Sequence, residues 1–223
     1  MKIYTDFIQG SHAWHEARLG IVTASTVGKL ITTKTLTVAN NDAARTLIAT
    51  LAAERITGQP TDTPFTRDME RGVLDEPLAR DAYAEHYAPV EEVAFITRRL
   101  KGGALIGYSP DGLVGDDGLI EIKSRKPHHQ VATILAGEVP RDHMAQLQAG
   151  LLVTGRDWID YVSYSGGLPL YVKRVEPDPD WLVAIYSATQ VADQRITETI
   201  EIFTALTAGI PETEYVDHFQ EMY

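Results

Sequence analysis

The spacing of apolar residues changes repeatedly along the chain, and this order of patterns constrains the fold. Apolar residues first follow helical spacing, then alternate every two residues as in strands. Helical spacing then returns and is followed by a second stretch of alternation. The expected elements are helices at 41–57, 66–87, 128–136, 141–153 and 179–207, and strands at 93–97, 104–107, 119–123, 158–164 and 170–175. Helices and strands interleaved in this way predict an α/β fold, with a central mixed β-sheet flanked by helices.

Glycine and proline mark the ends of these elements. Gly58 and Gly155 follow two of the helical patterns and are expected to cap their C-termini. Residues 59–64 are expected to form a loop, and the hairpin is expected to turn at Gly166-Gly167. Pro77 lies inside the 66–87 pattern, so we expect a kink or break just before it.

The composition is that of an ordinary globular protein. Of 223 residues, 44% are hydrophobic and 23% are charged, which suits one domain spanning residues 1–223. The chain contains no cysteine, so disulfides, thiolate zinc sites and a cysteine nucleophile are excluded. No window approaches about 18 uninterrupted apolar residues, and the first residues have no signal-peptide pattern. We therefore expect no membrane span and a cytoplasmic location.

The net charge of −11 is unevenly distributed. Residues 176–223 hold ten acidic residues and one basic residue, a net charge of −9, whereas residues 1–175 hold 21 acidic and 19 basic residues, a net charge of −2. An acidic protein is at first sight a poor partner for DNA phosphates. Because the acidity belongs to the C-terminal segment, we expect that segment to lie on an outer or partner-facing surface.

The most informative segment joins a turn aspartate to a strand. Asp111 follows one expected strand, and Glu121 and Lys123 lie two residues apart on the next. They therefore point to one face of the sheet, whereas Ile120 and Ile122 point to the other, where they are expected in the core. A solvent-facing Glu–Lys pair beside an ordinary turn aspartate is the alternative.

Two converging carboxylates and a lysine suit metal-assisted phosphodiester hydrolysis. Carboxylate oxygens favour Mg²⁺ or Mn²⁺, and the main-chain carbonyl of Ile122 is a further candidate ligand. Lys123 could then orient the attacking water and stabilise its hydroxide form.

Several segments resemble a known nuclease family. Pro110-Asp111 and Glu121-Ile122-Lys123 resemble the PD-(D/E)XK nuclease signature. The further segments are Gln9–Ser25, Glu70-Arg71-Gly72, Asp75–Arg80 and His143–Gln148. In this order and spacing, over residues 9–155, they resemble the YqaJ-like viral recombinases, which are relatives of phage lambda exonuclease.

This resemblance implies roles for particular residues. Asp111 and Glu121 would bind two metal ions, with Glu76 as an additional acid, and Lys123 would assist the attacking water. Gln146 would hold water or phosphate from its helix. The alternatives are an exposed glutamate at 76 and an ordinary amphipathic-helix position at 146.

Arg18, Thr23 and Ser25 form a second cluster. An arginine followed by hydroxyls and by N–H groups at a helix start can cradle a phosphate. In the family, this region resembles the pocket for the 5′ phosphate of a DNA end. The alternative, which is compatible, is that Thr23 or Ser25 caps a short helix while Arg18 pairs with a surface acid.

Two further expectations concern neighbouring side chains. Arg125 and Lys126 follow Lys123 closely, which favours contact with DNA phosphates over a merely solvated face. Trp14 is expected in the core rather than on a base-stacking surface.

The resemblance implies a Mg²⁺-dependent exonuclease. It would degrade double-stranded DNA from 5′ ends and leave 3′ single strands for recombination. A homotrimer and a single-strand annealing protein as partner are implied by the family. An endonuclease of the same superfamily and a non-catalytic DNA-binding module remain alternatives.

Overall fold

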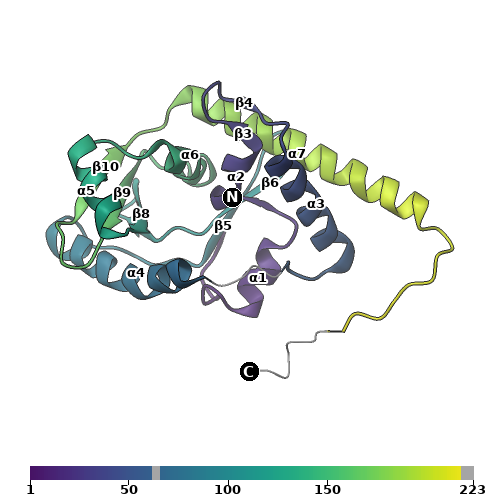
Figure 1. The fold of residues 1–223 in the computed structure, drawn as a ribbon, viewed down its shortest axis with the longest axis horizontal. Coiled ribbons are helices and arrows are strands. Elements are labelled where there is room, and N and C mark those ends of the chain that lie inside the picture. The colour runs from purple at the N-terminus through teal and green to yellow at the C-terminus, as the bar shows by residue number, and fades with distance from the viewer. Residues whose placement is uncertain (62–65, 217–223) are drawn as a thin grey trace.

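The computed structural model describes residues 1–61 and 66–216. The elements in chain order are β1 (Lys2–Tyr4), α1 (His12–Arg18), β2 (Val22–Thr23), α2 (Ala24–Val27), the 3-10 helix η1 (Gly28–Leu30), β3 (Ile31–Thr32), β4 (Thr37–Val38), α3 (Asp42–Thr57), α4 (Arg67–His86), β5 (Phe95–Arg99), β6 (Leu105–Tyr108), β7 (Gly112–Val114), β8 (Gly118–Ser124), α5 (Pro127–Ala136), α6 (Arg141–Thr154), β9 (Trp158–Tyr164), β10 (Tyr171–Val175) and α7 (Pro179–Leu206). Figure 1 shows their arrangement.

The larger sheets are both mixed. One has the order β1-β5-β6-β2, in which only β2 and β6 run parallel. The other has the order β10-β9-β8-β7, in which only β8 and β9 run parallel. The strands β3 and β4 form a small antiparallel pair. The expected mixed sheet is therefore present as two four-stranded mixed sheets.

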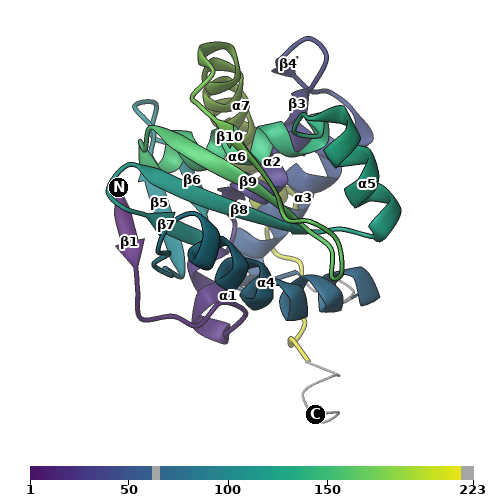
Figure 2. The same cartoon turned by 90° about the vertical axis from the view of Figure 1, so that its left-hand side faces the viewer.

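Helices cover both faces of the β7–β10 sheet. Helix α4 crosses one face, and α5 and α6 cover the other (Figure 2). Ile120 and Ile122 pack with Ala79 and Tyr83 of α4, in a buried cluster of their own. Glu121 lies on the opposite face, toward α6, which confirms the predicted division of β8 into an apolar face and a polar face.

The long helices and strands lie close to the ranges predicted from the sequence. The elements that the sequence did not predict are short. Helix α3 ends at Gly58 and α6 at Gly155, each with a left-handed backbone. The strands β1 and β7 have three residues each, and α1 buries none of its residues, so their patterns are too short or too polar to detect. Of the expected loop at 59–64, residues 62–64 lie outside the described residues.

The expected break near Pro77 does not occur. Helix α4 continues through this residue from Arg67 to His86. Proline lacks the N–H that would bond the carbonyl of Val73, one turn earlier. Because Val73 is exposed, water can satisfy that carbonyl without ending the helix.

The end of α7 and the described residues that follow it carry exposed acidic side chains away from the core. The last turns of α7 extend beyond the other helices and strands (Figure 1), and the charged side chains Glu198 and Glu201 are exposed there. Glu212 and Glu214, in the irregular residues that follow, are also exposed. Within the described residues, no helix combines the length and the apolar character needed to cross a membrane.

Gly107 of β6 lies so close to Phe95 of β5 that a larger residue at this position should destabilise the fold. A Cβ atom at Gly107 would lie 2.3 Å from the buried Phe95 ring. Gly107→Ala should therefore lower the free energy of unfolding by about 1–3 kcal/mol through overpacking, measured by urea denaturation. Gly72→Ala in α4 is the matched control, because its Cβ meets nothing within 4 Å. It should leave stability unchanged or raise it by up to about 1 kcal/mol, and equal losses in both variants would contradict this packing argument.

Candidate active site

A turn and a strand bring the two expected carboxylates together. Asp111 lies in the turn between β6 and β7, and its Oδ2 accepts the main-chain N–H of Ile122 at 2.6 Å. This bond fixes the aspartate against β8, next to Glu121 and Lys123. The sequence expectation that these three residues share one site is therefore consistent with the geometry.

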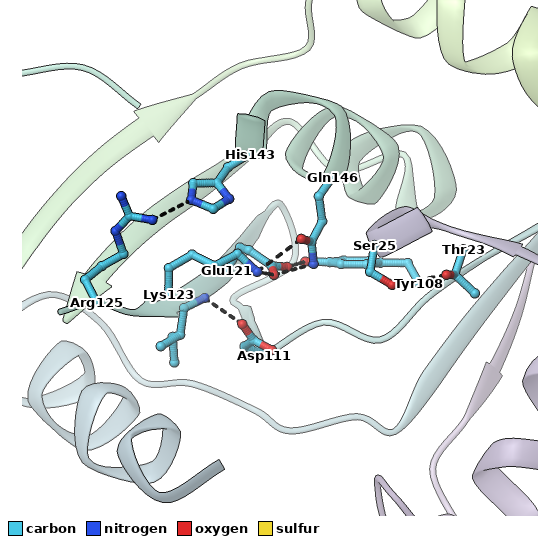
Figure 3. A network of polar contacts seen from close by, with 10 residues as sticks. Thr23, Ser25, Tyr108, Asp111, Glu121, Lys123, Arg125, His143 and Gln146 are labelled. Atoms are coloured by element: carbon cyan, nitrogen blue, oxygen red, sulfur yellow. Dashed lines mark hydrogen bonds and ion pairs between the residues drawn. The ribbon is translucent and has the colours of Figure 1, made fainter. Parts of the chain in front are cut away.

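Glu121 is the centre of the polar network in Figure 3. Its side chain is buried, and its Oε1 accepts hydrogen bonds from Lys123 Nζ at 2.7 Å and Gln146 Nε2 at 2.5 Å. Its Oε2 accepts the hydroxyl of the buried Tyr108 at 2.9 Å. Gln146 Oε1 in turn accepts from Lys123 at 3.1 Å. The predicted Gln146 thus faces the site from α6.

The charges in this network shift one another's pKa values. Burial, with the charges of Glu121 and Glu76, raises the pKa of Asp111 well above its usual range. Burial alone would lower the pKa of Lys123, but the charges of Glu121 and Asp111 outweigh it and raise that pKa. A raised pKa keeps Lys123 protonated at neutral pH, so it can orient a water and stabilise negative charge.

Glu76 approaches the site from α4 but is held by an arginine. Its carboxylate is ion-paired with Arg80, one turn later on the same helix. Arg80 also bonds the main-chain oxygen of Asp111 at 2.9 Å and pairs with Glu92 at 3.0 Å. Burial raises the pKa of Glu76, the Arg80 charge opposes this, and the charge of Glu121 adds to it. Glu76 is therefore near enough to sense the site electrostatically.

The donor set suits a hard divalent cation. Asp111 and Glu121 offer only oxygen donors, and their mutual repulsion is what a bound cation would relieve. Across residues 1–61 and 66–216, no three histidine, aspartate or glutamate side chains converge closely enough to hold a metal ion as they stand. For Glu76 to join the two carboxylates at a metal, it would have to exchange its Arg80 partner.

A cavity of about 200 Å³ adjoins the carboxylates. Its lining residues are Trp14, Arg18, Thr23, Ala24, Ser25, Tyr108, Ser109 and Gln146. All three residues of the second sequence cluster line it. Tyr108 and Gln146 belong to both the cavity and the Glu121 network, so the two clusters form one continuous site.

Arg18 provides the cavity with a fixed positive charge. Its Nη1 donates to Ser109 Oγ at 3.0 Å, and its guanidinium lies 4.0 Å from the centre of the Trp14 ring. Burial lowers the pKa of Arg18 to about 10, so it remains charged at neutral pH. The expectation that Trp14 belongs to the core is wrong: the ring is partly exposed, and its Nε1 donates to Ser109 at 3.0 Å.

Thr23 caps the short helix α2, and Thr23 and Ser25 both line the cavity. Thr23 is the N-cap of α2, and its N–H donates to Thr26 Oγ1 at 3.1 Å. The hydroxyls of Thr23 and Ser25 lie 3.1 Å apart and line the cavity. Arg18, in contrast, forms no ion pair within the described residues, so the alternative of a surface pair is not observed.

The two bases that follow β8 have different surroundings. Lys126 is exposed and pairs with Asp68 of α4 at 3.0 Å. Arg125 is partly buried, and its Nη1 lies 3.2 Å from His143 Nε2 (Figure 3). Only Arg125 thus remains beside Lys123 without a carboxylate partner among the described residues.

Three residues of the site were missed from sequence alone. Tyr108 and Ser109 lie directly before Asp111 in a segment already singled out, but a tyrosine and a serine in a turn carry no specific signal. Arg80 could have been found, because its spacing from Glu76 is that of a helical i,i+4 ion pair.

Comparisons with known proteins show which proteins this chain resembles. The family model described as the YqaJ-like viral recombinase domain matches residues 13–157. A search of curated proteins returns no match. An alkaline exonuclease from Laribacter hongkongensis is 32% identical, with a TM-score of 0.79, over 90% of this chain and 100% of its own.

Two further solved structures are similar. The same Laribacter enzyme in complex with dAMP gives the same identity, coverage and TM-score. A phage-related exonuclease from Haemophilus somnus is 14% identical, with a TM-score of 0.58, over 82% of this chain and 96% of its own, and it supports the fold alone. From the family match and the 32% identity to the Laribacter enzyme, the chain belongs to the YqaJ-like viral recombinase family, and it has the PD-(D/E)XK nuclease fold.

Proposed function

We propose that this chain, acting as one domain, is a Mg²⁺-dependent exonuclease. It degrades one strand of linear double-stranded DNA from the 5′ end and leaves 3′ single strands for phage-type recombination. The observation that carries the proposal is the continuous site, in which the cavity holding Arg18 shares Tyr108 and Gln146 with the buried Glu121. Binding of a terminal phosphate next to the reacting residues would direct cleavage to the end of a DNA strand.

The similar proteins support this activity. The Laribacter relative is an alkaline exonuclease, and it has been crystallised in complex with dAMP. A nucleotide phosphate is also the chemistry that the Arg18 cavity suits, because a guanidinium and hydroxyls recognise phosphate oxygens.

The metal ligands follow from the donor set. Asp111, Glu121, the carbonyl of Ile122 and, once released from Arg80, Glu76 would hold two Mg²⁺ ions, or Mn²⁺ in their place. Such ions would supply positive charge for the attacking and the leaving oxygen. Lys123 orients the attacking water and stabilises its developing negative charge, and Gln146 holds Lys123 and Glu121 in place.

Phosphate contacts divide between two regions. Arg18, Thr23 and Ser25 bind the 5′ phosphate of the DNA end inside the cavity. Arg125 and Lys126 bind phosphates along the strand, for which Lys126 exchanges its Asp68 partner.

The assembly is proposed from the family resemblance. The chain forms a ring-shaped homotrimer around DNA and works with a single-strand annealing protein. Exposed apolar side chains on the end of α7, at Ile202, Phe203 and Leu206, support the existence of a protein partner for this surface.

A polarity assay tests the proposed activity. Linear duplex DNA labelled separately at each 5′ and 3′ end should lose its 5′ labels first in the presence of Mg²⁺, while closed circular DNA stays intact. Cleavage of the circle would replace the exonuclease with an endonuclease of the same superfamily. If the protein binds but leaves 5′-phosphorylated linear duplex uncut, the non-catalytic binding module would replace it.

The role of Lys123 gives a sharper prediction. Lys123→Ala should slow cleavage by about 10²–10⁴-fold, because it removes the cation that stabilises charge at the attacking water. Duplex binding without divalent cation should stay within a few-fold of the unmodified chain, and thermal unfolding checks that the variant folds. Lys101→Ala, at an exposed lysine, is the control and should cleave normally. Cleavage by Lys123→Ala at the normal rate would exclude the assigned role.

The proposed role of Arg18 predicts that the enzyme distinguishes 5′-phosphorylated from 5′-hydroxyl DNA ends. Arg18→Ala should slow degradation of 5′-phosphorylated ends by roughly tenfold or more, because a charge-assisted phosphate contact is lost. It should affect 5′-hydroxyl ends little. Arg45→Ala, at an exposed arginine of α3, should change neither. An equal loss on both kinds of end would show that Arg18 acts elsewhere than at the terminal phosphate.

A further inference from the structure

A histidine of α6 contacts the arginine that follows the catalytic strand. Arg125 lies two residues beyond Lys123, and its Nη1 is 3.2 Å from His143 Nε2 (Figure 3). His143 lies three residues before Gln146, so the two side chains share a face of α6. Gln146 contacts Glu121 and Lys123, and His143 contacts Arg125. One face of α6 therefore makes hydrogen bonds to Glu121, Lys123 and Arg125.

The direction of the Arg125–His143 hydrogen bond is determined by chemistry. A guanidinium has only donors, so His143 Nε2 must accept, and the imidazole must be neutral with its proton on Nδ1. Burial, with the charges of Lys123 and Arg125, lowers the pKa of His143 to about 4, whereas the charge of Asp142 opposes this shift. The ring is therefore a neutral acceptor at neutral pH.

The orientation of the imidazole is also fixed. Its ring stacks on the buried ring of Tyr161, with centroids 5.5 Å apart and planes 25° from parallel. Tyr161 belongs to β9, which pairs with β8. The acceptor is thus anchored to the same sheet that carries Glu121 and Lys123.

Arg125 itself lacks a counter-charge. Within the described residues it forms no ion pair, and its Nε is buried without a hydrogen-bond partner. The nearby Lys123 is also positively charged. A partly buried arginine in this setting is stabilised by an anion, and phosphate suits its planar set of donors.

We propose that His143 is a positioning residue, which accepts one N–H of Arg125 and so directs the remaining guanidinium donors toward a DNA phosphate beside Lys123. This inference rests on the proposed nuclease function and on the phosphate contact assigned to Arg125. It adds a residue that touches neither the metal ligands nor the DNA. Its contribution is to restrict the arginine to one orientation before the substrate binds.

The expected effect is on substrate binding rather than on the chemical step. Ordering a flexible side chain on binding weakens affinity by about two- to tenfold. His143→Phe keeps an aromatic ring to stack on Tyr161 but removes the acceptor. It should raise KM for 5′-phosphorylated linear duplex by about two- to tenfold and leave kcat within about twofold.

A conservative variant and a matched control accompany this measurement. His143→Gln offers an amide oxygen to Arg125 and should bring KM back toward the unmodified value. His86→Phe, at an exposed histidine of α4, should change neither constant. Thermal unfolding checks each variant, and His143→Leu tests the same loss of the acceptor if the phenylalanine variant does not fold.

A double-mutant cycle decides whether His143 acts through Arg125. Once Arg125→Ala has removed the guanidinium, adding His143→Phe should raise KM no further. A further increase in the double variant, a loss of kcat at constant KM, or an unchanged KM in His143→Phe would each overturn the proposal. If the unmodified chain degrades no DNA, the proposed function fails. The same cycle, measured then by duplex binding without divalent cation, would still test the positioning role.

Discussion

The burial of one carboxylate, that of Glu121, is the constraint on which the site depends. A charged group with only 1% of its surface exposed is strongly destabilising unless its oxygens are satisfied. Tyr108 from β6, Lys123 from β8 and Gln146 from α6 supply three donors. Removing any of these donors would leave part of the charge of Glu121 unsatisfied. The three hydrogen bonds therefore hold β6, β8 and α6 together around the carboxylate and determine the shape of the site.

The sequence could predict the part of the site that local spacing determines. Glu121 and Lys123 share a face because side chains alternate along a strand. Asp111 was expected in a turn upstream of them, and it lies in the turn between β6 and β7. The partners of these residues depend instead on how elements far apart in sequence meet. Tyr108 and Ser109 gain their roles only from the contacts with Glu121 and Arg18. The position of Trp14 was wrongly predicted for the same reason. Its apolar ring suggested the core, but its indole N–H donates to Ser109, a distant residue in the sequence, at the cavity.

The fold shows the same division between local and long-range determinants. Long helices with glycine caps were predictable almost to the residue, because periodicity and capping are local signals. The partition of strands into two sheets was not, because it depends on which strand edges meet. The unbroken helix across Pro77 likewise depends on exposure, since water can satisfy the carbonyl that proline leaves unbonded.

The distribution of charge explains how an acidic chain can act on DNA. The exposed glutamates at the end of α7 do not line the cavity, whose charged residue is Arg18. Beside the cavity, two carboxylates that would repel phosphate are paired with cations: Glu121 with Lys123 and Glu76 with Arg80. Repulsion from the acidic end is weakened by screening beyond about 10 Å at ordinary salt. The local field at the site, rather than the net charge of −11, therefore decides whether a phosphate can approach.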